Sequence, residues 1–133
     1  MGMIHKTTLG IDYGRQRVGL AIGRHGLAEP LEILLGDLDF VDRLQEIISQ
    51  QQVEQLVVGI SENQMAKESR AFGQNLEREL GLPVHFTDET LSSQEARAKL
   101  RQTRVGKRQY KGPIDHFAAA VFLQDWLDSE PDI

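Results

Sequence analysis

The sequence contains no cysteine, which excludes disulfide bonds and zinc sites built on thiolates. No apolar run approaches the roughly 20 residues that a membrane-spanning helix needs, so we expect no membrane association. The N-terminal stretch MGMIHKTTLGID has no basic region followed by an apolar one, and it therefore does not resemble a signal peptide. These absences together predict a cytoplasmic protein.

Basic residues are scarce except in one segment. The chain carries 15 Lys and Arg against 20 Asp and Glu. The stretch 97–111, RAKLRQTRVGKRQYK, is rich in basic residues and holds no acid. A protein with a net negative charge does not ordinarily bind a polyanion such as nucleic acid, but a concentrated basic segment can bind one locally. The alternative is a merely solvated loop. The four cations that we expect to contact a nucleic-acid backbone are Arg104, Lys107, Arg108 and Lys111.

The 133 residues, about 40% of them hydrophobic, fit a single domain that spans 1–133. Apolar periodicity predicts strands at 7–13, 17–23, 27–35, 53–60 and 82–89, and helices at about 40–51, 64–80, 92–100 and 113–128. Pro30 favours an edge position for the third strand. The alternation of strands and helices in the second half implies parallel strands joined by crossovers. The predicted fold class is therefore α/β, with a mixed five-stranded sheet flanked by helices.

Acidic residues close the strands at one edge of this predicted sheet. Asp12 ends the first strand, and Asp88 and Glu89 end the last. Asp115 lies in the first turn of the final helix, which is apolar nearly all round. A carboxylate on such a helix needs a partner or a metal ion. The nearby basic residues lie in the predicted loop, so we expect no fixed basic partner. The attraction of a helix N-terminus for an anion is the alternative explanation.

Three carboxylates that meet at one sheet edge would form an oxygen cage suited to Mg²⁺ or Mn²⁺. Such a site can stabilise the charge that develops on a phosphodiester during hydrolysis. Glycines recur around Asp12, and we expect them to leave room for a phosphate backbone; they are Gly10, Gly14, Gly19 and Gly23. Taken singly, each acid also fits ordinary turn or helix-start chemistry.

Four segments together resemble the YqgF family, the pre-16S rRNA nucleases that are also described as Holliday-junction-resolvase-like proteins. The segments are LGIDYGRQRVGLAIG, LVVGI with Asn63 just beyond, DETLSSQEA, and GPIDHFAAAVFLQDWLD after the basic loop. The resemblance implies an RNase H-like fold and a catalytic, metal-binding triad of Asp12, Glu89 and Asp115, with Asp88 as the reserve ligand. It also implies Gly14 and Asn63 as parts of substrate loops.

The resemblance further implies hydrolysis, dependent on Mg²⁺ or Mn²⁺, of a phosphodiester in structured RNA or branched DNA. For this family it indicates maturation of the 5′ end of pre-16S rRNA in ribosome biogenesis. One departure concerns the stretch after LVVGI, where the family usually has Gly-x-Pro-Leu-Asn. Here Ser61 and Glu62 replace the Pro and Leu, which implies a change in loop rigidity or substrate choice.

Three other functions remain open from the sequence. One is a Holliday-junction resolvase acting in DNA recombination or repair, and another is a non-catalytic RNA-binding module. The segment DYGRQRVGLA also resembles the phosphate-binding start of actin-like ATPases, but the chain is too short for their second domain and has no P-loop pattern. The sequence is compatible with a monomer or a dimer.

Overall fold

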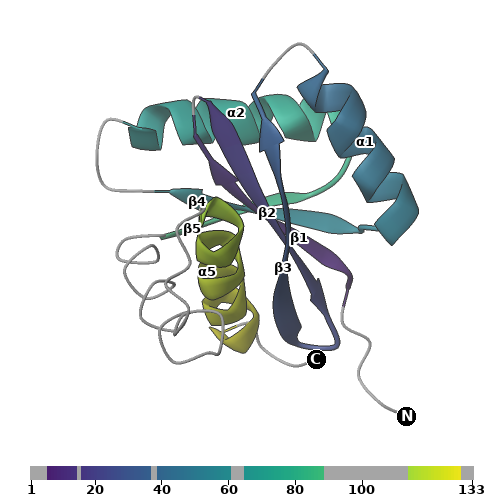
Figure 1. Ribbon diagram of the computed structural model, residues 1–133, viewed down its shortest axis with the longest axis vertical. Coiled ribbons are helices and arrows are strands. Elements are labelled where there is room, and N and C mark those ends of the chain that lie inside the picture. Colours follow the sequence, from purple (N-terminus) through teal and green to yellow (C-terminus); the bar gives the residue numbers. More distant parts are fainter. Residues whose placement is uncertain (1–5, 15, 37–38, 61–64, 89–113, 130–133) are drawn as a thin grey trace.

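The computed structural model of the chain describes residues 6–14, 16–36, 39–60, 65–88 and 114–129. The described part contains five strands and three helices (Figure 1). The strands are β1 (Thr8–Tyr13), β2 (Arg17–Arg24), β3 (Leu27–Leu35), β4 (Gln55–Ile60) and β5 (Val84–Asp88). The helices are α1 (Phe40–Gln51), α2 (Met65–Leu80) and α5 (Asp115–Ser129). The predicted elements in this part are confirmed, whereas the helix predicted at 92–100 and the basic loop lie outside the described residues.

The five strands form one sheet in the order β3-β2-β1-β4-β5. β1 pairs antiparallel with β2, and β2 pairs antiparallel with β3. β4 runs parallel to both β1 and β5. The predicted mixed sheet, with an antiparallel N-terminal half and parallel strands after it, is therefore confirmed.

The position of Pro30 is explained by its strand. β3 lies at an edge of the sheet and has no neighbouring strand on its outer side. A proline, which lacks an N–H, therefore costs no hydrogen bond between strands on that side. The register with β2 also shifts here, because Leu20 pairs with Glu32 while Ala21 pairs with Pro30. The extra residue, Leu31, forms a β-bulge, which is a second device that keeps an edge strand from pairing with other chains.

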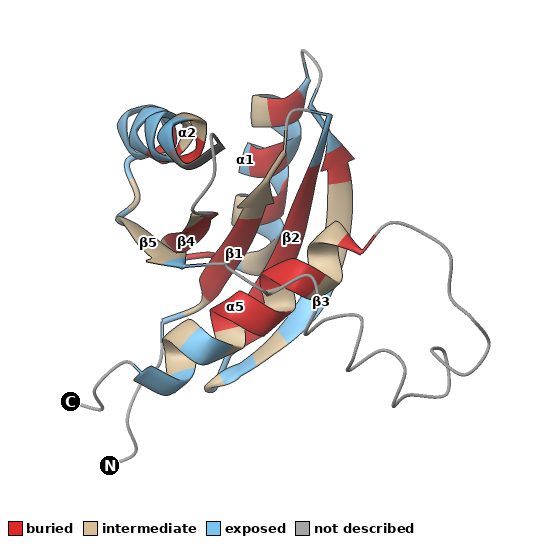
Figure 2. Cartoon of the chain, turned by 90° about the vertical axis from the view of Figure 1, so that its left-hand side faces the viewer, coloured by how far each residue is buried: buried red, intermediate tan, exposed pale blue. Residues whose placement is uncertain are grey.

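Helices cover both faces of the sheet (Figure 2). On one face, α1 and α2 enclose a buried core with side chains such as Leu9, Ile11 and Leu44. On the other face, α5 is the one helix that the described residues provide, with Phe122 and Leu123 fully buried against Val57 of β4. Among the helices that the structure describes, none is both long enough and apolar enough to cross a membrane.

The two helices on the first face end where the chain enters a left-handed conformation. Gln52 follows α1 with φ 57°, and its N–H bonds back to the carbonyls of the last turn. Gly81 follows α2 with φ 69°. Glycine reaches this conformation without strain, so Gly81 stops the helix at the position that the sequence indicates.

Candidate active site

Asp12 lies near the C-terminal end of β1, on the face of the sheet that α5 covers. Its register partner in β2 is Gly19. Side chains alternate along a strand, so Asp12 points to the same side as Gly10. A Cβ on Gly10 would lie 3.0 Å from Cβ of Leu123 in α5, which identifies that side as the α5 face. Asp12 is partly buried there.

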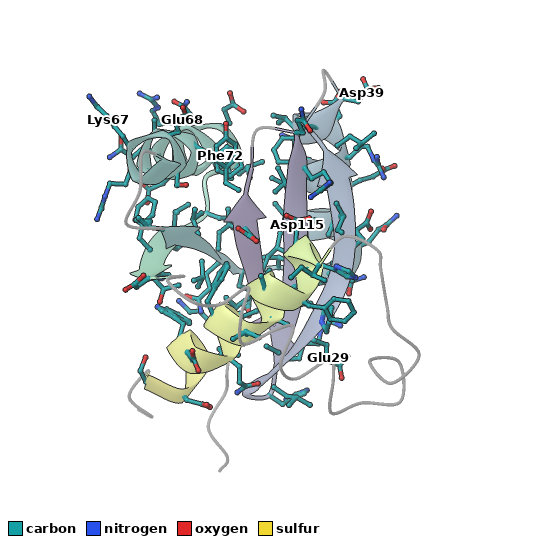
Figure 3. The ribbon with its side chains drawn as sticks, turned by 60° about the vertical axis from the view of Figure 1, so that its left-hand side comes forward. Glu29, Asp39, Lys67, Glu68, Phe72 and Asp115 are labelled. Atoms are coloured by element: carbon teal, nitrogen blue, oxygen red, sulfur yellow. The ribbon has the colours of Figure 1, made fainter. Side chains whose placement is uncertain are left out.

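Asp115 is brought to Asp12 by the first turn of α5. A Cβ built on Gly19 would overlap the carbonyl group of Asp115 and the amide of His116, so the helix start rests directly on that glycine. Since Gly19 is the cross-strand partner of Asp12, the two acids are neighbours across a single residue. Figure 3 shows Asp115 at the N-terminal end of α5, against the sheet. Asp12 and Asp115, far apart in sequence, thus lie on the same face of the sheet and both adjoin Gly19.

The glycines around Asp12 do not serve the purpose that we expected. Gly10, Gly19 and Gly23 all face α5, where added Cβ atoms would meet Leu123, Asp115 and Leu127. Their lack of a side chain lets the helix approach the sheet closely. At Gly14 a Cβ would lie 2.6 Å from the carbonyl oxygen of Arg17, within the turn between β1 and β2. The expectation that the glycines clear space for a phosphate backbone is therefore wrong for these four positions, which are filled by the protein's own chain.

Asp115 also has a fixed basic partner, contrary to our expectation. Nε of Arg17 donates a hydrogen bond to Oδ2 of Asp115 at 3.0 Å. The Arg17 side chain is 49% exposed and that of Asp115 25% exposed, so the pair lies at the rim of the site. Sequence reasoning missed Arg17 because it looked for cations near Asp115 in the chain. Strand alternation was the available signal, since it places Arg17 and Gly19 on the same face of β2.

The reserve ligand Asp88 occupies a different position. It is exposed at the end of β5, where it pairs with Ile60 of β4. Strand alternation places it on the side of Val84 and Phe86, which pack against the α1–α2 core. Asp12 lies on the opposite face. Asp88 therefore does not lie on the face of the sheet that carries Asp12.

The other predicted site residues lie outside the described part of the chain. They are Asn63, Glu89, Arg104, Lys107, Arg108 and Lys111. Within the described part, no three His, Asp or Glu side chains gather closely enough to hold a metal ion. The two acids that do meet, Asp12 and Asp115, offer hard oxygen donors, the type that Mg²⁺ and Mn²⁺ prefer. A cationic side chain already lies on one of them, so the donor set fits a divalent cation in part.

His116, next to Asp115, has a pKa that differs from the ordinary value of a histidine. Burial lowers the pKa of His116, and the neighbouring charge of Asp115 opposes that shift. The ring packs on Phe117 with centroids 4.2 Å apart. Its Nδ1 is buried and has no hydrogen-bond partner among the residues that the structure describes. A neutral imidazole fits this environment better than a charged one.

The opposite face of the sheet holds a separate hollow of about 290 Å³. It is lined by side chains from β1, α1 and α2, among them Tyr13, Phe40 and Phe72. Tyr13 and Phe72 stack there with ring centroids 4.3 Å apart. Since Tyr13 follows Asp12 directly and points the other way, this hollow and the carboxylates lie on opposite sides of the same strand end.

Comparison with known proteins gives a consistent set of relatives. A family profile described as "RuvX: Holliday junction resolvase" matches residues 6–129. A protein of Anaeromyxobacter dehalogenans (strain 2CP-C), provisionally named a pre-16S rRNA nuclease, is 38% identical over 131 residues, which cover 91% of this chain and 96% of that protein. A protein of Opitutus terrae with the same provisional name is 41% identical over 131 residues, covering 90% of each chain.

Solved structures with a similar fold are those of RuvC from Thermus thermophilus. The complex of that protein with a Holliday junction substrate has a TM-score of 0.58 at 18% identity, covering 92% of this chain and 94% of that one. Another structure of the same protein has a TM-score of 0.56 at 16% identity and covers 95% and 98% of the two chains. At such low identity the likeness concerns the fold alone, and it confirms the expected RNase H-like architecture.

Proposed function

The chain belongs to the RuvX family, also called YqgF, and from this premise we propose that it is a metal-dependent nuclease that hydrolyses phosphodiester bonds in structured nucleic acid. The substrate we favour is the 5′ end of pre-16S rRNA, because the curated relatives carry that activity in their names. Ribosome biogenesis then places the protein in the cytoplasm. The single observation that carries the proposal is the meeting of Asp12 and Asp115 across Gly19.

In this proposal Asp12 and Asp115 hold the metal ion, and Glu89 completes the set of ligands. A bound Mg²⁺ or Mn²⁺ supplies Lewis-acid stabilisation of the charge on the scissile phosphate. The chain holds both described carboxylates on rigid elements, one on a central strand and one on the first turn of a packed helix. Rigid placement matters because carboxylates of like charge would otherwise move apart.

In this proposal the basic segment binds the backbone of the substrate. Arg104, Lys107, Arg108 and Lys111 lie shortly before Asp115 in the chain. We assign them to phosphate contacts, which fix the position of a nucleic acid without reading its sequence. Gly14 and Asn63 remain our candidates for the substrate loops, with Gly14 acting through the shape of the β1–β2 turn.

Holliday-junction resolution is the second candidate, and the description of the matching family profile favours it. The two candidates share one site and differ only in the substrate. A four-way DNA junction and a fragment with the 5′ end of pre-16S rRNA therefore serve as parallel substrates for one enzyme preparation.

The decisive experiment compares cleavage of both substrates with Mg²⁺ or Mn²⁺ by the wild type, Asp12→Asn and Asp115→Asn. Each substitution removes a charge while keeping the shape of the side chain. Asp125→Asn is the matched control, because Asp125 is an exposed acid on the same helix as Asp115. We expect cleavage to fall at least a hundredfold in the two site variants and to persist in the control. Full turnover in Asp12→Asn would overturn the site, and salt-sensitive binding without any cleavage by the wild type would favour a non-catalytic RNA-binding module.

A further inference from the structure

Arg17 contacts one acid of the proposed metal site, Asp115, and is a diagonal neighbour of the other, Asp12. It begins β2 two residues before Gly19, so its side chain is on the same face of the sheet as that glycine and its partner Asp12. In an antiparallel pair, such diagonal neighbours are within reach of a long side chain. Its Nε already contacts Oδ2 of Asp115 at 3.0 Å. The guanidinium group of Arg17 thus contacts Asp115 and lies on the same face of the sheet as Asp12.

We propose that Arg17 exchanges partners during the reaction: it neutralises Asp115 in the metal-free protein and binds a phosphate of the nucleic acid once Asp115 is a metal ligand. The inference rests on the proposed function, since it requires Asp115 to bind the metal. It assigns to Arg17 a substrate-positioning role. It also explains how a carboxylate beside Asp12 is tolerated before any metal is bound.

The first half of the exchange is a competition for one oxygen. Oδ2 of Asp115 accepts the hydrogen bond from Arg17, and a divalent cation coordinated by that oxygen would face the positive guanidinium at close range. Arg17 therefore weakens metal binding. The weakening is modest, because about half of the Arg17 side chain is exposed and ion pairs of that kind are weak.

The second half follows from the chemistry of the guanidinium group. It is planar, always charged and carries five N–H donors, a geometry that suits two oxygens of one phosphate. Arg17 occupies the first position of β2, where its exposed half faces solvent at the rim of the site. A small rotation about its flexible side chain is enough to exchange a carboxylate oxygen for a phosphate oxygen.

Metal binding tests the competition directly, without reference to activity. Calorimetric titration of the full chain with Mn²⁺, in the absence of nucleic acid, compares the wild type with Arg17→Gln and Arg17→Lys. We expect Arg17→Gln to bind Mn²⁺ about two- to fivefold more tightly, the range that removal of an exposed ion pair allows. Arg17→Lys keeps the charge and should stay within twofold of the wild type. A merely structural Arg17 predicts weaker binding or no change.

The described part of the chain offers a matched control in another arginine–carboxylate pair, Arg43 and Glu32. Nη2 of Arg43 lies 3.5 Å from Oε2 of Glu32, and the Arg43 side chain is 48% exposed. Arg43 belongs to α1, on the far face of the sheet from Asp115. Arg43→Gln removes the same charge from a similar ion pair, and it should leave the affinity for Mn²⁺ unchanged.

Nucleic-acid binding tests the second half. Affinity for a four-way DNA junction is measured against salt concentration, once with a chelator and once with Ca²⁺ as a divalent ion that accepts carboxylate ligands. Loss of one phosphate contact lowers the slope of log K against log salt by about 0.9 for duplex DNA. We expect this loss in Arg17→Gln with Ca²⁺ and little change with the chelator, when Arg17 is held by Asp115.

The outcomes separate this inference from the proposed function. If Mn²⁺ binds the wild type and is lost in Asp115→Asn, the metal site stands. If Arg17→Gln then fails to tighten Mn²⁺ binding, or equals the wild type in salt slope with Ca²⁺, the role of Arg17 is overturned on its own. If the wild type does not bind Mn²⁺, the proposed function and this inference both fall.

Discussion

The main chain of Asp115 rests directly on Gly19, so closely that a Cβ at position 19 would occupy the space of the Asp115 carbonyl group. Backbone atoms cannot move aside as the end of a flexible side chain can. Gly19 therefore fixes the distance between the helix that carries Asp115 and the strand that carries Asp12. The proposed site depends on a residue that has no functional group of its own.

Gly19→Ala should consequently damage both stability and activity. The added methyl group must push the first turn of α5 away from the sheet, and overpacking of this kind costs about 1–3 kcal/mol in the free energy of unfolding. The shift also separates Asp115 from Asp12, so metal-dependent cleavage should fall by at least tenfold under conditions where the variant remains folded. Urea unfolding and a cleavage assay measure the two effects.

Gly23→Ala is the control, since Gly23 lies on the same strand and faces the same helix. Its added Cβ would meet Cδ1 of Leu127 at 2.9 Å, the movable end of a side chain. We expect a smaller loss of stability and unchanged cleavage, because the start of α5 is not displaced. Equal losses of activity in both variants would contradict a specific role for Gly19 in placing Asp115.

Much of this arrangement could be predicted from the sequence, because the signals were local. The apolar periodicity, Pro30 and Gly81 defined the strands, the sheet edge and a helix end, and the structure confirms them. The acids at the end of β1 and at the start of α5, Asp12 and Asp115, were predicted to lie at one edge of the sheet, and the structure places both next to Gly19.

The errors concerned contacts between distant segments. The regular glycines of β1 and β2 were taken as space for a ligand, whereas three of them receive α5. A sequence shows that a side chain is missing at such a position, but it does not show which group fills the space. Likewise, Arg17 and Asp115 are separated by 98 residues, and only the packing of α5 on β2 brings them together.

Gln124 joins α5 to the turn between β2 and β3, and this link should contribute to stability alone. Its Oε1 accepts a hydrogen bond from the N–H of Ala28 at 2.8 Å, and its Nε2 donates to the carbonyl of Gly26 at 2.9 Å. Gln124→Leu leaves these partly buried backbone groups unpaired, at a cost of about 1–3 kcal/mol. Thermal and urea unfolding should show this loss, while cleavage by the folded variant should match the wild type.

Asp128→Ala provides the comparison for Gln124. Oδ1 of Asp128 also accepts a hydrogen bond from Nε2 of Gln124 at 3.0 Å, but this contact is exposed. Water replaces an exposed hydrogen bond readily, so the change in the free energy of unfolding should stay within about 0.5 kcal/mol. If Asp128→Ala lowers the free energy of unfolding as much as Gln124→Leu does, the hydrogen bonds of Gln124 to Gly26 and Ala28 are not the source of the stability.

The lowered pKa of His116 predicts a dependence of stability on pH in the metal-free protein. Burial lowers the pKa of this group, with Asp115 opposing the shift, whereas the unfolded chain takes up the proton near the ordinary value of about 6.5. Between the lowered folded pKa and about 6.5, the unfolded state therefore binds more protons. Stability from this group is present above that interval and is lost as the pH falls through it.

The measurement compares urea unfolding at pH 7.5 and pH 5.5, with a chelator present, for the wild type and His116→Gln. Carboxylates also titrate in acid, but they do so in both proteins, so the difference between them isolates the histidine. We expect the wild type to lose more stability on acidification than the variant does. Identical losses would mean that His116 has the same pKa in the folded and unfolded chains.

Gly73 of α2 packs closely against the ring of Phe86 on β5. Gly73 lies inside α2, and a Cβ there would be 2.6 Å from the ring of Phe86 on β5. Alanine is favoured over glycine in a helix by about 1 kcal/mol, whereas the clash with a packed ring costs about 1–3 kcal/mol. Gly73→Ala alone should therefore be neutral or destabilising in urea unfolding. In a Phe86→Leu background the ring is gone, so the same substitution should become stabilising by up to about 1 kcal/mol. A double-mutant cycle measures this change of sign. If the effects of the two substitutions on the free energy of unfolding are additive, the ring of Phe86 is not the reason why position 73 requires glycine.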